Sequence, residues 1–158
     1  MSRENGQIGD FRIMTSGDPV ELDRYLTDYL HSHPECEIYV GSDSQNLRAK
    51  TVYVSTIVIR HPGKGAHVLY TKSKVPVIRD IFNKLWGELE RSVQLAEYLQ
   101  NELLIEVQQI DLDYNADESF PSNKVLNAAS GYVQSLGYTV KAKPELLMAV
   151  WAANVLCN

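Results

Sequence analysis

A chain of 158 residues with 44% hydrophobic and 22% charged residues has the length and composition of one globular domain, which excludes a fibre and an intrinsically disordered chain. No apolar stretch approaches the roughly 20 residues that a membrane-spanning helix needs, and the polar N-terminus has no apolar signal core. We therefore expect a cytoplasmic protein with no membrane partner. Cys36 and Cys157 are too few for a disulfide framework and are expected to be free thiols.

The net charge of −5 conceals a segregation of charge along the chain. Residues 44–87 carry eight Lys and Arg side chains and one acid, whereas the rest of the chain carries seven basic and nineteen acidic side chains. A basic surface beside a carboxylate-rich region is typical of a protein that binds phosphate groups. The alternative is a set of solvated strand edges on which lysine discourages aggregation.

The first elements in chain order are an arm and a helix. Residues 1–17 show little periodicity and are predicted to form a flexible N-terminal arm. Asp18 as a cap, Pro19 at the first helical position and apolar residues at helical spacing predict a helix over 18–33. With no repeat or linker in the sequence, residues 18–158 are predicted to form a single domain.

Strands and helices follow in a regular order. Three strands are predicted at 36–43, 51–61 and 66–75, and the sequence HPGKG between the last two marks a hairpin turn. The second half of the chain is predicted to contain helices at 77–100, 121–136 and 144–156 and strands at 103–112 and 138–142. After the first helix, the order is therefore βββαβαβα, which indicates one α/β domain.

The most informative residue is Asp43, which lies in the apolar strand candidate EIYVGSDSQ at 37–45. Acids are depleted from strand interiors and are almost never fully buried unless they are paired, so Asp43 needs a compensating partner such as a cation. A later predicted strand runs into Asp111 and Asp113, whose side chains fall on one face because side chains alternate along a strand. Two acidic strand ends indicate a metal site.

The helix predicted over 77–100 carries four acids, and a helical wheel distinguishes them. Glu88 lies at the margin of the apolar stripe, whereas Glu90 lies well away from it. We expect Glu88 to face the sheet and Glu90 to face water. The alternative for Glu88 is a carboxylate at the rim that pairs with a neighbouring base such as Lys84 or Arg91.

Five motifs in order carry a resemblance to a known family over roughly residues 36–156. They are YVGSDSQ at 39–45, LWGE at 85–88, ID at 110–111 with SNK at 122–124, GYV at 131–133 with GY at 137–138, and KP at 143–144. On these motifs the chain resembles the YkuK-type family of predicted ribonuclease H-like nucleases. The resemblance implies an α/β ribonuclease H-like fold, with a mixed five-stranded sheet flanked by helices and an extra N-terminal helix.

The resemblance also implies a catalytic site. It assigns Asp43, Glu88 and Asp111 as the acids that hold the metal and carry catalysis. Oxygen-only ligation favours Mg²⁺ or Mn²⁺ over zinc, so one of these two ions is the expected cofactor. Two such ions can activate the attacking water and stabilise the leaving oxygen of a phosphodiester.

The chain departs from the family pattern at positions next to these acids. Gln109 stands where the family usually has a histidine, and Asp113 stands where it has an asparagine. Asn154 in the last helix stands where the family usually has an aspartate, so it is expected to offer a weaker, neutral oxygen ligand. Asp113 is a candidate replacement for the missing carboxylate or, alternatively, a solvated acid that caps the following loop.

Candidate substrate contacts are polar or basic side chains near the predicted acids. They are Ser42, Ser44, Gln45, Lys72, Lys74, Ser122, Asn123 and Lys143. The alternative is that these are ordinary turn, cap and surface residues. The expected function is metal-dependent hydrolysis of phosphodiester bonds in RNA, DNA or a hybrid of the two. A catalytically weakened or inactive nucleic-acid-binding or assembly module on the same fold is the alternative.

One group of zinc-type ligands stands apart from the acids. His31, His33 and Cys36 lie close together in the sequence at the predicted end of the first helix. A single cluster without a second ligand pair does not make a zinc finger, so these three are expected to be loop residues.

Overall fold

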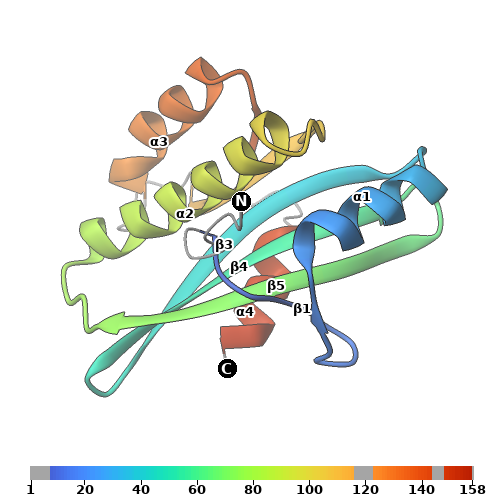
Figure 1. Ribbon diagram of the computed structural model, residues 1–158. Helices are drawn as coiled ribbons and strands as arrows, with labels where there is room; N and C mark the ends of the chain where they lie inside the picture. The colour runs from blue at the N-terminus through green and yellow to red at the C-terminus, as the bar shows by residue number, and fades with distance from the viewer. Residues whose placement is uncertain (1–7, 116–122, 144–147, 158) are drawn as a thin grey trace.

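The computed structural model describes residues 8–115, 123–143 and 148–157, which form a mixed sheet with helices on both faces (Figure 1). The strand order across the sheet is β2-β1-β5-β4-β3-β6-β7. The elements are β1 Phe11–Ile13, β2 Pro19–Val20, α1 Leu22–Ser32, β3 Glu37–Leu47, β4 Lys50–His61, β5 Gly65–Pro76, α2 Ile81–Asn101, β6 Gln109–Asn115, α3 Asn123–Ser135, β7 Thr139–Lys143 and α4 Met148–Cys157. None of the helices in these described ranges combines the length and apolarity needed to cross a bilayer.

The centre of the sheet is an antiparallel meander of β3, β4 and β5, the elements that correspond to the three strands predicted first in the chain. Residues 51–59 of β4 are all buried, as expected for a strand with neighbours on both sides and helices on both faces. β6 joins β3 in parallel and β7 joins β6 in parallel, so the sheet is mixed, as predicted. This arrangement places the carboxyl-terminal half of β3 next to the carboxyl-terminal end of β6.

The predicted number of strands is wrong, because the sheet has seven strands rather than five. Residues 11–13, assigned to the flexible arm, form β1 and pair with β5, and residues 19–20, assigned to the helix, form β2. Phe11 is 1% exposed, so burial of its ring in the core stabilises this short edge hairpin. The first helix is α1, which begins at Leu22, after its N-cap Glu21.

The ends of α2 also differ from the prediction. Asp80 is its N-cap, because the Asp80 carboxylate accepts a hydrogen bond from Asn83 N at 2.8 Å. At the other end, Leu104 adopts a left-handed conformation with φ 56°, and Ile105 N donates to Leu99 O. The apolar run after α2 therefore closes the helix, and the strand predicted from residue 103 begins only at Gln109.

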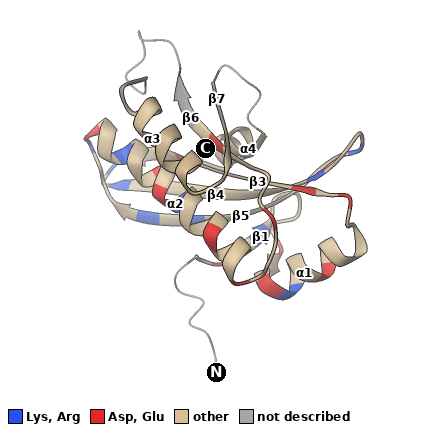
Figure 2. Cartoon of the chain, turned by 90° about the horizontal axis from the view of Figure 1, so that it is seen from above, with Lys and Arg blue, Asp and Glu red and all other residues tan. Residues whose placement is uncertain are grey.

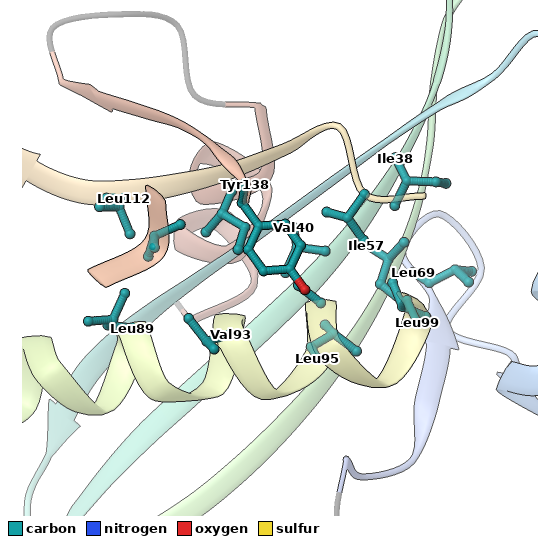
Figure 3. Close-up of a cluster of buried hydrophobic side chains, with 14 of the residues drawn as sticks. Ile38, Val40, Ile57, Leu69, Leu89, Val93, Leu95, Leu99, Leu112 and Tyr138 are labelled. Atoms are coloured by element: carbon teal, nitrogen blue, oxygen red, sulfur yellow. The ribbon is translucent and has the colours of Figure 1, made fainter. Parts of the chain in front are cut away.

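The main core lies between the sheet and the helices α1, α2 and α3. Figure 3 shows aliphatic side chains of α2, including Leu89, Val93 and Leu99, beside those of the sheet. α4 covers the opposite face, where Ala153 and Cys157 pack against Val52 and Val54 of β4. Because α2 and α4 lie on opposite faces, β3 is flanked by a helix on each side.

Candidate carboxylate site

Three acids are the buried charged side chains among the described residues. Asp43, Glu88 and Asp111 are 5%, 4% and 1% exposed. A buried carboxylate is costly unless hydrogen bonds or a cation compensate its charge. All three belong to elements that meet around the carboxyl-terminal half of β3, so these acids define the candidate site.

The two aspartates share one face of the sheet. Asp111 pairs with Gly41 across the parallel ladder, and Asp43 lies two residues farther along β3. Residues two apart on a strand point to the same face, so the Cα atoms of the two aspartates are diagonal neighbours about 8 Å apart. In the described part of the chain, the pairing of β3 with β6 ends at Gly41 and Asp111. The site therefore lies where two neighbouring strands separate.

Asp43 is held from its own backbone and from α4. Its Oδ1 accepts a hydrogen bond from Ser44 N at 2.8 Å, and its Oδ2 accepts one from Asn154 Nδ2 at 2.9 Å. The nitrogen of the Asn154 amide, rather than its oxygen, therefore faces the carboxylate. Donors to a carboxylate favour its charged form, so these contacts help to compensate its burial.

Glu88 reaches β3 from the opposite face. Its Oε1 accepts a hydrogen bond from Ser44 Oγ at 2.6 Å. Ser44 therefore connects the two acids, because its backbone N–H binds Asp43 and its hydroxyl binds Glu88. The prediction from the helical wheel is confirmed, since Glu88 is buried and Glu90, two residues later, is exposed.

A chain of hydroxyl groups lies on the same face as Glu88. Ser92 Oγ and Ser55 Oγ are each 2.8 Å from Ser42 Oγ. Ser42 is 2% exposed and its hydroxyl is engaged inside the protein, so in this structure it supports the packing of α2 on the sheet rather than facing a substrate. Gln45 is half-buried and, by strand alternation, lies on the face of Asp43.

Asp111 is held at the N-terminus of α4. Its Oδ1 accepts from Gln109 Nε2 at 2.6 Å, and its Oδ2 accepts from Ala149 N at 2.9 Å. Burial raises the pKa of the Asp111 carboxyl, although the Gln109 amide and the backbone N–H groups of Ala149 and Val150 act in the opposite direction. The helix N-terminus also favours a negative charge at this position. The net direction shows that burial outweighs the donors.

The raised pKa of Asp111 predicts a dependence of stability on pH. A group whose pKa is higher in the folded than in the unfolded state contributes stability that is lost as the pH rises from its ordinary value, 3.8, through its folded value. In chelator, the free energy of unfolding of the wild type minus that of Asp111→Asn is therefore expected to fall across this window by at most about 1.4 kcal/mol per pH unit. Urea unfolding of both proteins from pH 3.5 to 7.5 measures the difference. A difference that stays constant or rises with pH would contradict the assignment.

The three acids are neighbours but do not form a compact ligand set. Among residues 8–115, 123–143 and 148–157, Asp43, Glu88 and Asp111 do not bring one oxygen each to within 4.8 Å of one another. The group that meets this distance is Glu35, Cys36 and His61, at the other end of β3. Cys36 was considered as a ligand from the sequence, but its partner His61, 25 residues later, was not. The signal that could have found His61 is the neighbouring order of the first two predicted strands, because antiparallel pairing would bring the start of one beside the end of the other.

Basic side chains extend from the site along the same face. The pairing register places Lys72 two strands away from Asp43, through Val54, and Lys74 two strands away from Gln45. Both lysines are exposed. Figure 2 shows Lys and Arg gathered where β4 and β5 approach the start of α2. Arg48 and Lys50 stand at the turn into β4, with Lys50 opposite Pro76 of β5, and Arg79 and Lys84 stand on either side of Asp80, the N-cap of α2. The segregation of charge in the sequence therefore becomes a basic end of the sheet.

Several predicted residues cannot be placed by their side chains. Asp113 and Lys143 lie in β6 and β7, and Asn123 begins α3, but their side chains lie outside the described set, as does all of Ser122.

A polar cavity of about 380 Å³ lies nearby between α2 and the sheet, lined by residues that include Tyr53, Arg91 and Gln94. It is separate from the three acids, none of which lines it.

The fold and the site together define a class of protein. A sheet with an antiparallel meander followed by two parallel strands, and acids on the first central strand, the following long helix and the next strand, is the arrangement that the ribonuclease H-like resemblance implies. The family model described as Ribonuclease H-like matches residues 22–157, and the chain belongs to this family. A search of curated proteins gave no match.

Proposed function

We propose that this protein is a nuclease that hydrolyses phosphodiester bonds of RNA or DNA and depends on Mg²⁺ or Mn²⁺. The observation that carries the proposal is the position of the buried acids. Asp43, Glu88 and Asp111 are the charged side chains buried among the described residues, and they lie together at the point where β3 and β6 separate. The chain belongs to the ribonuclease H-like family, which also supports metal-dependent hydrolysis of phosphodiester bonds.

The donor set suits a hard divalent cation. Asp43, Glu88 and Asp111 offer carboxylate oxygens only, which suit Mg²⁺ and Mn²⁺, and a cation would offset the cost of burying three acids in one region. When bound, such ions supply an activated water and stabilise the leaving oxygen of an in-line displacement.

The other side chains orient the acids. Ser44 holds Glu88 and Asp43 in a fixed relation, Gln109 and Ala149 N hold Asp111, and Asn154 holds Asp43. Lys72 and Lys74 carry positive charge on the face of Asp43, where the phosphates of a bound strand would lie.

A second candidate function is a nucleic-acid-binding module without catalysis. Both oxygens of Asp111 already accept hydrogen bonds, and Asn154 presents its amide nitrogen to Asp43. These contacts stabilise the acids without a cation, which favours a site that has lost metal affinity. Labelled single-stranded, duplex and hybrid substrates incubated across a titration of Mg²⁺ and Mn²⁺ separate the two functions. Metal-dependent cleavage supports the nuclease, and binding without cleavage on every substrate supports the module.

Asn154→Asp is expected to strengthen the metal site. A second carboxylate replaces a neutral donor beside Asp43, so the metal concentration for half-maximal cleavage should fall about tenfold or more. Without metal, the loss of a donor to a charged acceptor and the new repulsion should lower the free energy of unfolding by about 1.5–3 kcal/mol. Cleavage assays and thermal unfolding with and without Mn²⁺ measure both effects. Asn154→Ala is the control, because it removes the donor without adding charge; an equal metal requirement in the aspartate variant and the wild type would contradict the prediction.

Lys72 and Lys74 are expected to contact phosphates. Each contact releases counterions, so the double variant Lys72→Gln/Lys74→Gln should reduce the slope of log affinity against log salt by about 1.4 on single strands and about 1.8 on duplexes. Binding assays across a salt series in chelator measure this slope. The matched control is Arg24→Gln/Lys64→Gln, which removes two exposed charges away from the basic end. Equal slopes in the two double variants would make Lys72 and Lys74 ordinary surface residues.

A further inference from the structure

A second group of ligand-type side chains lies at the opposite end of β3 from Asp43. Glu35 and Cys36 stand in the loop before β3, and His61 ends β4. Cys36 Sγ lies 3.3 Å and Glu35 Oε1 lies 3.9 Å from His61 Nδ1, and the three atoms lie within 4.8 Å of one another. Seven residues of extended chain separate Cys36 from Asp43, which is roughly 23 Å. The group is therefore independent of the carboxylate site.

The sheet itself brings these residues together. β3 and β4 are antiparallel, and their pairing places Glu37 opposite Arg60 at this end of the hairpin. The next residue outward on each strand is Cys36 on one side and His61 on the other. The position of the thiol beside the imidazole is consequently fixed by the register of the two central strands rather than by a mobile loop.

Neighbouring groups orient the imidazole for ligation. His61 Nε2 lies 2.6 Å from Tyr29 Oη, so this nitrogen is engaged with the phenol and Nδ1 faces the sulfur and the carboxylate. A hydrogen bond on the second ring nitrogen is what metal-ligating histidines use to fix their tautomer and orientation. His33 lies beside this ring, with 5.2 Å between the centroids, and its Nδ1 is 3.0 Å from Tyr29 O. Its donor atoms nevertheless lie outside the 4.8 Å group, so the ligands are Glu35, Cys36 and His61.

We propose that Glu35, Cys36 and His61 bind one Zn²⁺ ion, with water in the fourth position. Thiolate sulfur, imidazole nitrogen and carboxylate oxygen are the three ligand types that zinc uses in proteins. Zinc bonds of 2.0–2.3 Å at tetrahedral angles place ligand atoms roughly 3.3–3.7 Å apart, close to the separations of His61 Nδ1 from the sulfur and the carboxylate. The ion would join the loop before β3 to the end of β4 and so stabilise this end of the hairpin.

Metal binding by the full-length chain tests the proposal directly. After dialysis against a chelator, titration with Co²⁺ should give the intense visible bands of tetrahedral Co²⁺ and a thiolate-to-cobalt charge-transfer band in the near ultraviolet, and both should saturate at one equivalent. One equivalent of Zn²⁺ should abolish both signals. Zinc at about 100 times its dissociation constant should raise the unfolding temperature by on the order of 5–10 °C.

Matched variants separate this site from other binding. Cys36→Ser should lose the charge-transfer band and the thermal shift, whereas Cys157→Ser, which alters the other thiol of the chain, should keep both. Asp43→Asn should also keep both, because it alters only the carboxylate site. The wild-type spectrum tests the proposal even if a variant fails to fold. A wild-type titration without a thiolate band, or a band that is unchanged in Cys36→Ser, overturns the proposal.

Discussion

Asp43→Asn is expected to abolish metal-dependent cleavage, with a loss of at least about a thousandfold in rate. Asp43 is the buried acid at the centre of β3, and the proposed metal chemistry requires its negative charge. A thousandfold loss corresponds to about 4 kcal/mol of transition-state stabilisation, within the several kcal/mol that a bound metal provides. The asparagine retains the shape of the side chain and one acceptor for Ser44 N, so the fold should persist. Single-turnover cleavage and circular dichroism measure the two effects.

Glu90→Gln is the matched control for this variant. It removes one carboxylate from the same part of the protein, but Glu90 is exposed on α2 and outside the site. Cleavage by this variant should equal that of the wild type. A folded Asp43→Asn protein that cleaves as fast as Glu90→Gln would show that the acid on β3 has no part in catalysis.

Gly41→Ala is expected to lower the free energy of unfolding by about 2–4 kcal/mol. A Cβ atom at Gly41 would lie 2.8 Å from Ala149 Cβ and 3.0 Å from Val150 N, so α4 has to move away from β3. Overpacking of this kind costs about 1–3 kcal/mol, and the displaced helix also weakens the bond from Ala149 N to Asp111. Urea unfolding of the variant at neutral pH measures the loss. Cleavage should fall as well, because Asp111 loses a donor that orients it.

Gly131→Ala is the matched control, and its free energy of unfolding is expected to change in the opposite direction under the same conditions. Gly131 lies inside α3, and a Cβ atom there would meet no heavy atom within 4 Å. Alanine in a helix interior is favoured over glycine by about 0.5–1 kcal/mol, so this variant should be slightly more stable than the wild type. Equal stability of Gly41→Ala and the wild type would mean that α4 does not lie against β3 as described.

Much of the fold can be predicted from periodicity. The long apolar strands of the meander and the amphipathic α2 each bury many side chains, so their patterns are strong. The short strands β1 and β2 have no such pattern. Their formation depends on the pairing of β1 with β5, which lies far along the chain, and on the burial of Phe11 in the core. The end of α2 is hidden for a different reason, since the left-handed Leu104 lies in an apolar run that reads as a strand.

The candidate site is predictable to the level of residue type and burial. The alternation of strand side chains and the helical wheel identify Asp43, Asp111 and Glu88, which are buried as expected of a shared site. The roles of Gln109 and Asn154 as donors to two of these acids depend on tertiary contacts, and no local pattern encodes them. The meeting of Cys36 with His61 likewise depends on strand register.

Anomalous diffraction from crystals soaked in Mn²⁺ tests the central claim most directly. A manganese peak is expected within about 2.2 Å of an oxygen of Asp43, with Glu88 and Asp111 holding the same ion or its neighbour directly or through water. In that state Asn154 should have turned its amide oxygen toward the ion or moved away from Asp43. A structure in which Asp43 keeps its bonds to Ser44 and Asn154 and no manganese lies beside it, at a concentration that saturates any cleavage, would contradict the account.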